Sequence, residues 1–324
     1  MRWEAGDEFG LAVMGHTRQK SAVMTKTALS RALLLSTLLS PVPSRAEESA
    51  GAVLVAVQRK YEHAVAMSAQ GRTAEAEAEL RDIVGTCSRV FGKDHPDTLI
   101  NRSNLAATLA EQGKYAEAER ENRDVLAIRR RVLGDRHPDT LMSRNNLAAA
   151  LQELGRHAEA VKEYREVLQV RLKVLGADHL ETLDSRNNLA TAFQDQGRHA
   201  EAEKEHRTVF ALREKILGLR HPKTLSSRNN LATVLQELGR HVEAEQEHRA
   251  VLDFRQQVLG ANHPDVFLSC FNLALCLEAQ AKPEEALRVM RRAHAGFQRT
   301  LGAGHPHTRV AGESAGLIEA QLKP

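Results

Sequence analysis

The stretch LGDRHPDTLMSRNNLAAALQELGRHAEA, residues 133–160, decides the fold because close copies of it recur along the chain. The string Gly-x-x-His recurs every 42 residues, starting at Gly92, Gly134, Gly176, Gly218, Gly260 and Gly302. The strings Asn-Leu-Ala and Glu-Ala recur with the same spacing. Three series in phase predict six structural units of 42 residues, which together cover 51–302.

Within one unit, residues 135–176, the apolar positions predict two amphipathic helices, A and B. The stripe of helix A consists of Leu141, Leu147, Ala148, Leu151 and Leu154. The stripe of helix B consists of Ala160, Tyr164, Val167, Leu168, Val174 and Leu175. Pro138 suits the first position of helix A, and Gly155 and Gly176 suit the helix ends. Each antiparallel pair can bury its apolar faces only by stacking on its neighbours, so the sequence predicts an all-α solenoid.

The whole chain then divides into three parts. Residues 1–50 form a leader, either disordered or a cleavable signal-like segment, residues 51–302 form the six helix pairs, and residues 303–324 form a capping helix. The first helix A is expected around Leu54–Gln70. In the last segment Ser314-Ala315-Gly316 stands where Asn-Leu-Ala would fall.

Composition excludes several classes of protein. The formal charge is +3, from 45 Lys and Arg against 42 Asp and Glu, which disfavours a strongly basic nucleic-acid binder. Three scattered cysteines make no disulfide framework. Only 4% of the residues are aromatic, which fits thin layers of Leu and Ala better than one large core.

No motif for catalysis or for a cofactor is present: the chain has no H-E-x-x-H, no Walker loop, no dinucleotide fingerprint and no G-x-S-x-G. The 15 His residues are mostly explained by the repeat. His199 and His206, like His241 and His248, are seven residues apart, a rise of about 10.5 Å that is too long for one compact metal site. We therefore expect no enzyme activity, no cofactor and no metal.

The residues quoted above resemble tetratricopeptide repeats, in particular the 42-residue variety found in kinesin light chains and in many bacterial repeat proteins. The resemblance covers 51–302 and implies a right-handed α-solenoid of six helix pairs. Kinesin light chains carry a long heptad segment that attaches them to the motor, and no such segment precedes residue 51, so a motor-adaptor role is not expected. Family members bind peptides in a concave groove lined by the A helices.

The resemblance implies that the Asn of each Asn-Leu-Ala faces this groove. The matching residues are Asn104, Asn146, Asn188, Asn230 and Asn272. A primary amide both donates and accepts, so a ladder of amides could hold a peptide by its main chain. The neighbouring positions that would select a ligand include Met142 and Asp184, and the flanking arginines are Arg102, Arg144, Arg186 and Arg228.

Alternatives stay open for both series. The Asn side chains could instead bond the adjacent helix and stabilise stacking. The arginines are expected to form salt bridges between repeats, with acidic ligands as the other choice.

The function expected from these observations is that of a non-catalytic scaffold that binds a peptide or protein segment in the groove. The alternative is a structural or self-assembly module without a peptide ligand. We expect a monomer with a protein or peptide partner, with neither a nucleic-acid partner nor a membrane span.

The leader suggests a location. Residues 9–46 contain five basic and no acidic residues, an apolar run at Ala32–Val42 and a small-x-small string at Ser44–Ala46. This pattern at 24–46 is similar to a secretory signal and predicts export to the periplasm or the medium, with a cytoplasmic protein as the alternative.

Overall fold

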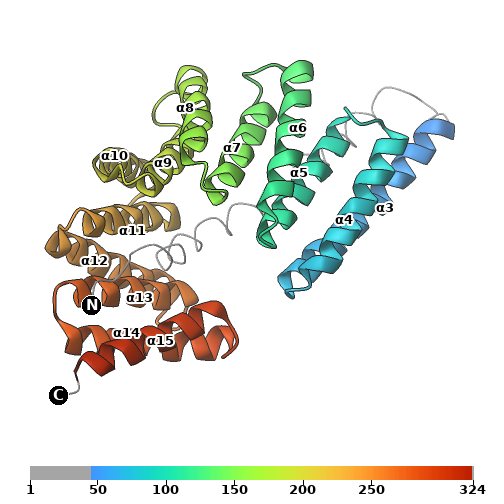
Figure 1. Cartoon of the computed structure of the whole chain (residues 1–324). Coiled ribbons are helices and arrows are strands. Elements are labelled where there is room, and N and C mark those ends of the chain that lie inside the picture. Colours follow the sequence, from blue (N-terminus) through green and yellow to red (C-terminus); the bar gives the residue numbers. More distant parts are fainter. Residues whose placement is uncertain (1–44, 323–324) are drawn as a thin grey trace. The chain divides into compact units, whose positions relative to one another are not determined.

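The computed structural model describes residues 45–322, which form thirteen helices and no strand (Figure 1). The A helices are α3 (Arg45–Ala69), α5 (Pro96–Glu111), α7 (Pro138–Glu153), α9 (Leu180–Asp195), α11 (Pro222–Glu237), α13 (Pro264–Ala279) and α15 (Pro306–Gln321). The B helices are α4 (Thr73–Val90), α6 (Tyr115–Leu133), α8 (His157–Val174), α10 (His199–Leu217), α12 (His241–Leu259) and α14 (Pro283–Leu301). Consecutive helices pack against each other from α3 to α7 and from α9 to α15. The all-α solenoid architecture of stacked helix pairs is thereby confirmed.

The packing divides the chain into two compact units, residues 1–163 and 164–324, and the division falls inside α8. Helices α3 to α7 belong to the first unit, and helices α9 to α15 belong to the second. Residues 1–44, which hold most of the 1–50 leader and of the signal-like pattern at 24–46, lie outside the described residues, while residues 45–50 form the start of α3.

The turn that leads into each A helix after α3 explains the Gly-x-x-His string. Gly134 follows α6 with a φ of 84°, a left-handed conformation that glycine adopts without strain. His137 is then the N-cap of α7, where its Nδ1 accepts a hydrogen bond from the Asp139 N–H at 3.2 Å. The same cap is made by His95, His179, His221, His263 and His305. The repeated histidines are therefore structural residues that satisfy a free N–H group at each helix start.

Proline begins α7 at Pro138, as the sequence predicted. In α9 Leu180 takes its place, and His179 still caps the helix at 3.2 Å from the Glu181 N–H. The cap, rather than the proline, is thus common to these starts.

Most of the predicted stripes are buried, but three of their members are not. Leu154, Val174 and Leu175 are 36%, 58% and 39% exposed. Leu154 is the residue that follows α7, while Val174 and Leu175 lie at the end of α8. The predicted stripes extended the helical period into the last turn of each helix. No neighbouring helix covers these last turns, so the predicted burial of the three residues was wrong. The first A helix also differs from its expected bounds, because α3 already begins at Arg45.

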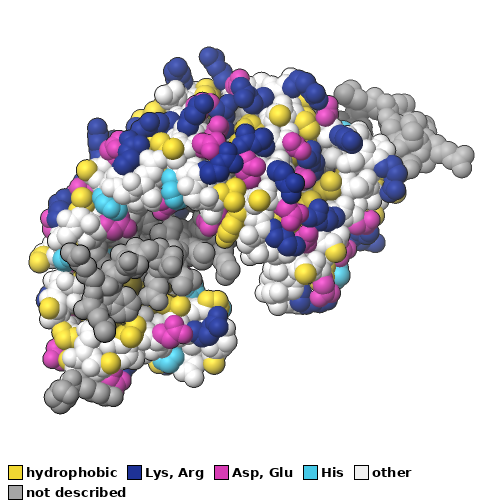
Figure 2. All heavy atoms as spheres, in the orientation of Figure 1, with side chains coloured by type: hydrophobic (Ala, Val, Ile, Leu, Met, Phe, Trp, Pro, Cys, Tyr) yellow, Lys and Arg dark blue, Asp and Glu magenta, His cyan; other side chains and the backbone are white. Residues whose placement is uncertain are grey.

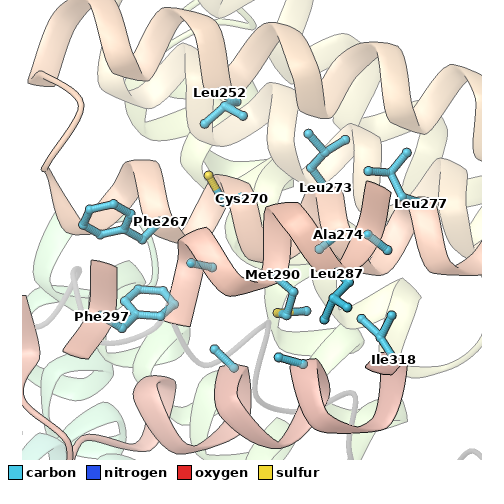
Figure 3. Close-up of a cluster of buried hydrophobic side chains, with 14 of the residues drawn as sticks. Leu252, Phe267, Cys270, Leu273, Ala274, Leu277, Leu287, Met290, Phe297 and Ile318 are labelled. Carbon is cyan, nitrogen blue, oxygen red and sulfur yellow. The ribbon is translucent and has the colours of Figure 1, made fainter. Parts of the chain in front are cut away.

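The core of the second unit shows how few aromatic rings the fold needs. Figure 3 shows the side chains of α12, α13, α14 and α15 that meet in one buried cluster. Phe267 and Phe297 lie edge to face, with ring centroids 6.2 Å apart. Around them Leu, Ala, Met and Cys side chains fill the layer between the helices.

Helix α15 packs on α14 and has no B helix of its own among the described residues. Three buried positions of α13 carry Cys270, Ala274 and Leu277. On α15 the residues 42 positions further on are Gly312, Gly316 and Glu319. On α15 these apolar side chains are replaced by two glycines and by Glu319, which pairs with Arg291 of α14 at 2.8 Å. That residues 303–324 act as a capping helix stays a prediction.

Candidate ligand-binding face of the A helices

Neighbouring A helices lie side by side in register, joined by polar side chains 43 residues apart. In the second unit the Asn230 amide of α11 donates to Asn187 Oδ1 of α9 at 2.8 Å, and the Asn272 amide of α13 donates to Asn229 Oδ1 of α11 at 2.9 Å. Gln321 of α15 likewise donates to Glu278 of α13 at 3.1 Å.

The first unit has the same kind of bond: Ser68 of α3 donates to Glu111 of α5 at 2.9 Å. Within each unit the A helices therefore present one continuous surface, which we call the A-helix face.

The predicted Asn ladder lies along this face. Asn104, Asn146, Asn188 and Asn230 are half-buried, and Asn272 is buried with 8% exposure. The amide N–H groups of Asn230 and Asn272 are used in the bonds between A helices. These bonds support the stacking role that we kept as the alternative, while ligand binding by the ladder stays a prediction.

The flanking arginines form ion pairs, but inside a repeat and not between repeats. Each one reaches a glutamate of its own B helix, 19 residues further on: Arg102–Glu121 at 2.8 Å, Arg144–Glu163 at 3.3 Å, Arg186–Glu205 at 2.6 Å, and Arg228–Glu247. In the sixth repeat the corresponding residues are Cys270 and Val289, both packed in the apolar cluster. The expectation of bridges between repeats was therefore wrong for these arginines, which fasten helix A to helix B.

Bridges between repeats are made by another set of residues, at the turns before α6, α8, α12 and α14. A glutamate of one B helix binds the cation 37 residues further on: Glu77–Lys114 at 2.6 Å, Glu119–Arg156 at 3.4 Å, Glu203–Arg240 at 2.6 Å and Glu245–Lys282 at 2.7 Å. Burial would raise the pKa of Glu245, but hydrogen bonds from Lys282, Arg249 and Gln280 lower it to about 2. In the sequence, a Lys or Arg directly after the residue of the A–B turn, 37 residues after a glutamate, is the signal that could have predicted these bridges.

A second arginine series, missed in the sequence, is buried between repeats. Each guanidinium donates from Nη1 to a serine hydroxyl of the next A helix: Arg129–Ser143 at 2.8 Å, Arg171–Ser185 at 2.8 Å, Arg213–Ser227 at 2.6 Å and Arg255–Ser269 at 2.8 Å. Burial lowers the pKa of Arg255, and the nearby Asp265 opposes this effect. The arginines and serines recur 14 residues apart, which is the signal that a search for paired periodic positions would detect.

The two selectivity positions have different surroundings. Met142 is half-buried on α7, where it belongs to the A-helix face of the first unit. Asp184 on α9 forms ion pairs with the buried Arg213 and with Lys223, the latter at 3.2 Å. Asp184 is therefore held by its neighbours, and a ligand at this position would meet a carboxylate that is already paired.

The buried histidines lie inside B helices. His206 Nε2 is 2.8 Å from Gln194 Oε1, which ties α10 to α9. Burial, with the positive charge of Arg255, lowers the pKa of His248 to about 4, so this side chain is neutral near pH 7. Within 45–322 no group of three or more His, Cys, Asp or Glu side chains is placed to hold a metal ion.

Charges of both signs are interspersed over the face of the molecule that Figure 2 presents. None of the helices between residues 45 and 322 combines the length and the apolar character that crossing a bilayer needs.

Comparisons with known proteins agree with this geometry. A family model described as Tetratricopeptide repeat matches five overlapping segments, 57–131, 101–173, 139–215, 182–257 and 223–299. It describes a structural repeat, and no enzyme family is indicated. No curated protein matches the chain.

The chain is similar to many solved structures, including the following three. Kinesin light chain TPR-like repeats from Podosopora anserina share 30% identity with a TM-score of 0.56, over 64% of this chain and 98% of that one. BtubC (BKLC) from P. vanneervenii shares 20% identity with a TM-score of 0.55, over 78% and 94%. A Rap protein complexed with Competence and Sporulation Factor shares 13% identity with a TM-score of 0.50, over 81% and 74%. The chain belongs to the tetratricopeptide-repeat family, and its repeats are similar to those of kinesin light chains.

Proposed function

We propose that the chain is a non-catalytic scaffold that binds a peptide or protein segment on its A-helix face, the concave groove of the family. The observation that carries the proposal is the contrast between the two sides of each helix pair. The B helices are fastened to their neighbours by periodic ion pairs and buried arginines. The A-helix face instead presents half-buried side chains that differ between repeats, such as Ile100, Met142, Ser226 and Leu268 at one position.

The fold itself also supports a protein partner. A Rap protein of this fold is complexed with Competence and Sporulation Factor. The surface here combines amides and hydroxyls that suit a peptide main chain with variable positions that suit its side chains.

A selection from a random peptide library, with the full chain as bait, tests the proposal. Bound peptides should lose at least about fivefold in affinity on Gln236→Ala, a half-buried residue of the A-helix face, since a lost hydrogen bond costs ~1 kcal/mol. Lys204→Ala, an exposed residue of α10, is the matched control and should leave affinity unchanged. If no peptide is enriched, or if the control weakens binding as much, the proposal fails.

The double change of Asn146 and Asn188 to Ala separates the two roles of the ladder. A loss of affinity larger than the loss of thermal stability indicates ligand binding. A collapse of stability with no ligand on this face would favour the structural or self-assembly module instead.

We also propose that the protein acts as a monomer and is exported. Light scattering of the full chain, with and without residues 303–324, tests the first part. N-terminal sequencing of the natural protein tests the second, and an intact leader would exclude export.

A further inference from the structure

We infer that the A-helix face of the second unit takes a peptide that carries bulky apolar side chains next to basic ones, with the apolar side chains on α13 and α15. The inference rests on the proposed function and specifies its ligand. It follows from a change in chemistry along one face, at positions that the repeat otherwise keeps in register.

The change occurs between α11 and α13. Two positions of the face carry Ser226 and Thr233 on α11. The matching residues on α13 are Leu268 and Leu275, and Phe271 lies one turn from each. All three α13 side chains are half-buried, so the polar surface of α11 gives way to an apolar one.

This apolar patch continues onto α15. Leu317 stands 42 residues after Leu275 and is 50% exposed. Leu268, Phe271 and Leu275 are partly buried and pack against the cluster whose members Figure 3 labels. The inner part of the patch thus belongs to the core, while its outer part, with Leu317, stays exposed to water.

Carboxylates border the patch and specify the charge of the occupant. Glu278 of α13 is hydrogen-bonded to Gln321, which is neutral and leaves its charge uncompensated. Glu313 of α15 is exposed at the position 42 residues after Phe271, and no cation pairs with it in the part of the chain that the structure describes. A peptide with Lys or Arg beside its apolar residues complements this border.

The same charges disfavour other occupants. Two copies of the chain that met through this face would bring like carboxylates together, which is costly in an isologous contact. An anionic lipid surface would be repelled in the same way.

The peptide-library selection, read by composition, tests the inference. Peptides enriched on the full chain should carry two or more bulky apolar residues and a Lys or Arg. For a synthetic copy of one such peptide, Leu275→Thr with Leu317→Thr should weaken binding at least about tenfold, because two leucine contacts are lost. Thr191 and Thr233 occupy this position in two other repeats, so the variant is expected to fold. The control Leu219→Thr changes a 37% exposed leucine in the turn before α11 and should leave affinity within about twofold.

Glu278→Gln with Glu313→Gln should weaken binding about three- to tenfold at low salt and less at high salt. Should the double leucine variant melt early by circular dichroism, the half-exposed Leu317→Thr alone replaces it, with an expected loss of about threefold or more.

The outcomes separate the two proposals. Polar or acidic peptides that bind the A-helix face equally well in the leucine variant would overturn this inference and leave the proposed function standing. A dimer in sedimentation that the leucine variant dissociates would show that a second copy covers the patch, and this too overturns the inference. If no peptide is enriched, both proposals fail.

Discussion

The buried His248 should make the second unit less stable as the pH falls from 7 to 5. The side chain is 1% exposed on α12, and burial together with Arg255 lowers its pKa to about 4. The unfolded chain takes up a proton with a pKa of about 6.5. Because the folded pKa lies below the unfolded one, the stabilisation is complete above pH 6.5 and is lost as the pH falls toward 4.

The magnitude follows from the two pKa values. At pH 7 the folded histidine is neutral and only about a quarter of the unfolded chains carry the proton, so this contribution to the free energy of unfolding is only about 0.2 kcal/mol. At pH 5 the unfolded histidine is almost fully protonated while the folded one stays neutral, which removes about 2 kcal/mol.

The assay is urea unfolding followed by circular dichroism at pH 7 and pH 5, with hydrogen exchange of α12 amides to locate the effect. His248→Met is the matched variant because Met290 holds the same position in the next repeat. The loss of stability between the two pH values should be smaller by about 2 kcal/mol in the variant, since other histidines titrate equally in both proteins. An equal loss in both proteins, or a folded-state titration of His248 near pH 6.5 by NMR, would refute the reasoning.

Three further changes have directions that the structure sets. Ala281→Gly should stabilise the chain by up to about 1 kcal/mol in urea unfolding, because Ala281 has a φ of 55° where other repeats have glycine, and an unchanged midpoint would contradict this. Gly296→Ala should lower the free energy of unfolding by at least ~2 kcal/mol, because its Cβ would lie 2.2 Å from the Phe267 ring. Adding Phe267→Leu should recover most of that loss, and no recovery would refute the packing argument. Arg255→Met should lower the free energy of unfolding by about 1–3 kcal/mol, because it leaves the Ser269 hydroxyl without its donor. The double variant Arg255→Met with Ser269→Ala should lose less stability than this. Equal losses of the two variants in thermal melts would show that the pair is not coupled.

Much of the fold could be predicted because each helix boundary repeats. Pro138 and Gly134 mark a helix start and a turn in their own right, and six copies of Gly-x-x-His in phase exclude chance. The prediction failed at Val174 and Leu175, where the helical period continues but the covering helix does not. Periodicity describes one helix, whereas burial depends on where the neighbouring helix ends.

The candidate site was less predictable because ion pairing depends on distances across helices. Arg102 precedes Asn104 by two residues in a way that suggests the groove, yet it contacts Glu121, 19 residues away on α6. The Asn ladder was located on the correct helices, but its bonds to the preceding A helix involve Asn187 and Asn229, which the sequence does not distinguish from their neighbours. Which residues are bonded across helices follows from their spacing in the sequence. That spacing can be interpreted only once neighbouring A helices are known to be in register at 43 residues.

Comparison among the repeats of this one chain then separates structural positions from ligand positions. The buried pair Arg255 and Ser269 is replaced by Cys87 and Asn101 near the first repeat, where the Asn101 amide donates to Cys87 Sγ at 3.7 Å. After the last repeat Phe297 stands at the arginine position, and its partner is an alanine. Two positions that change together between repeats are structural partners, because a change in one of them alone would leave a cavity or an unsatisfied polar group.

The positions of the A-helix face behave differently. Thr233 becomes Leu275 although the buried position beside it keeps a small residue, Ala232 on α11 and Ala274 on α13. Leu275 packs on the outside of the apolar cluster and is only partly buried, so its exposed part is available to a molecule outside the fold. We therefore propose that a ligand accounts for the part of the apolar patch on α13 and α15 that the core beneath it leaves exposed.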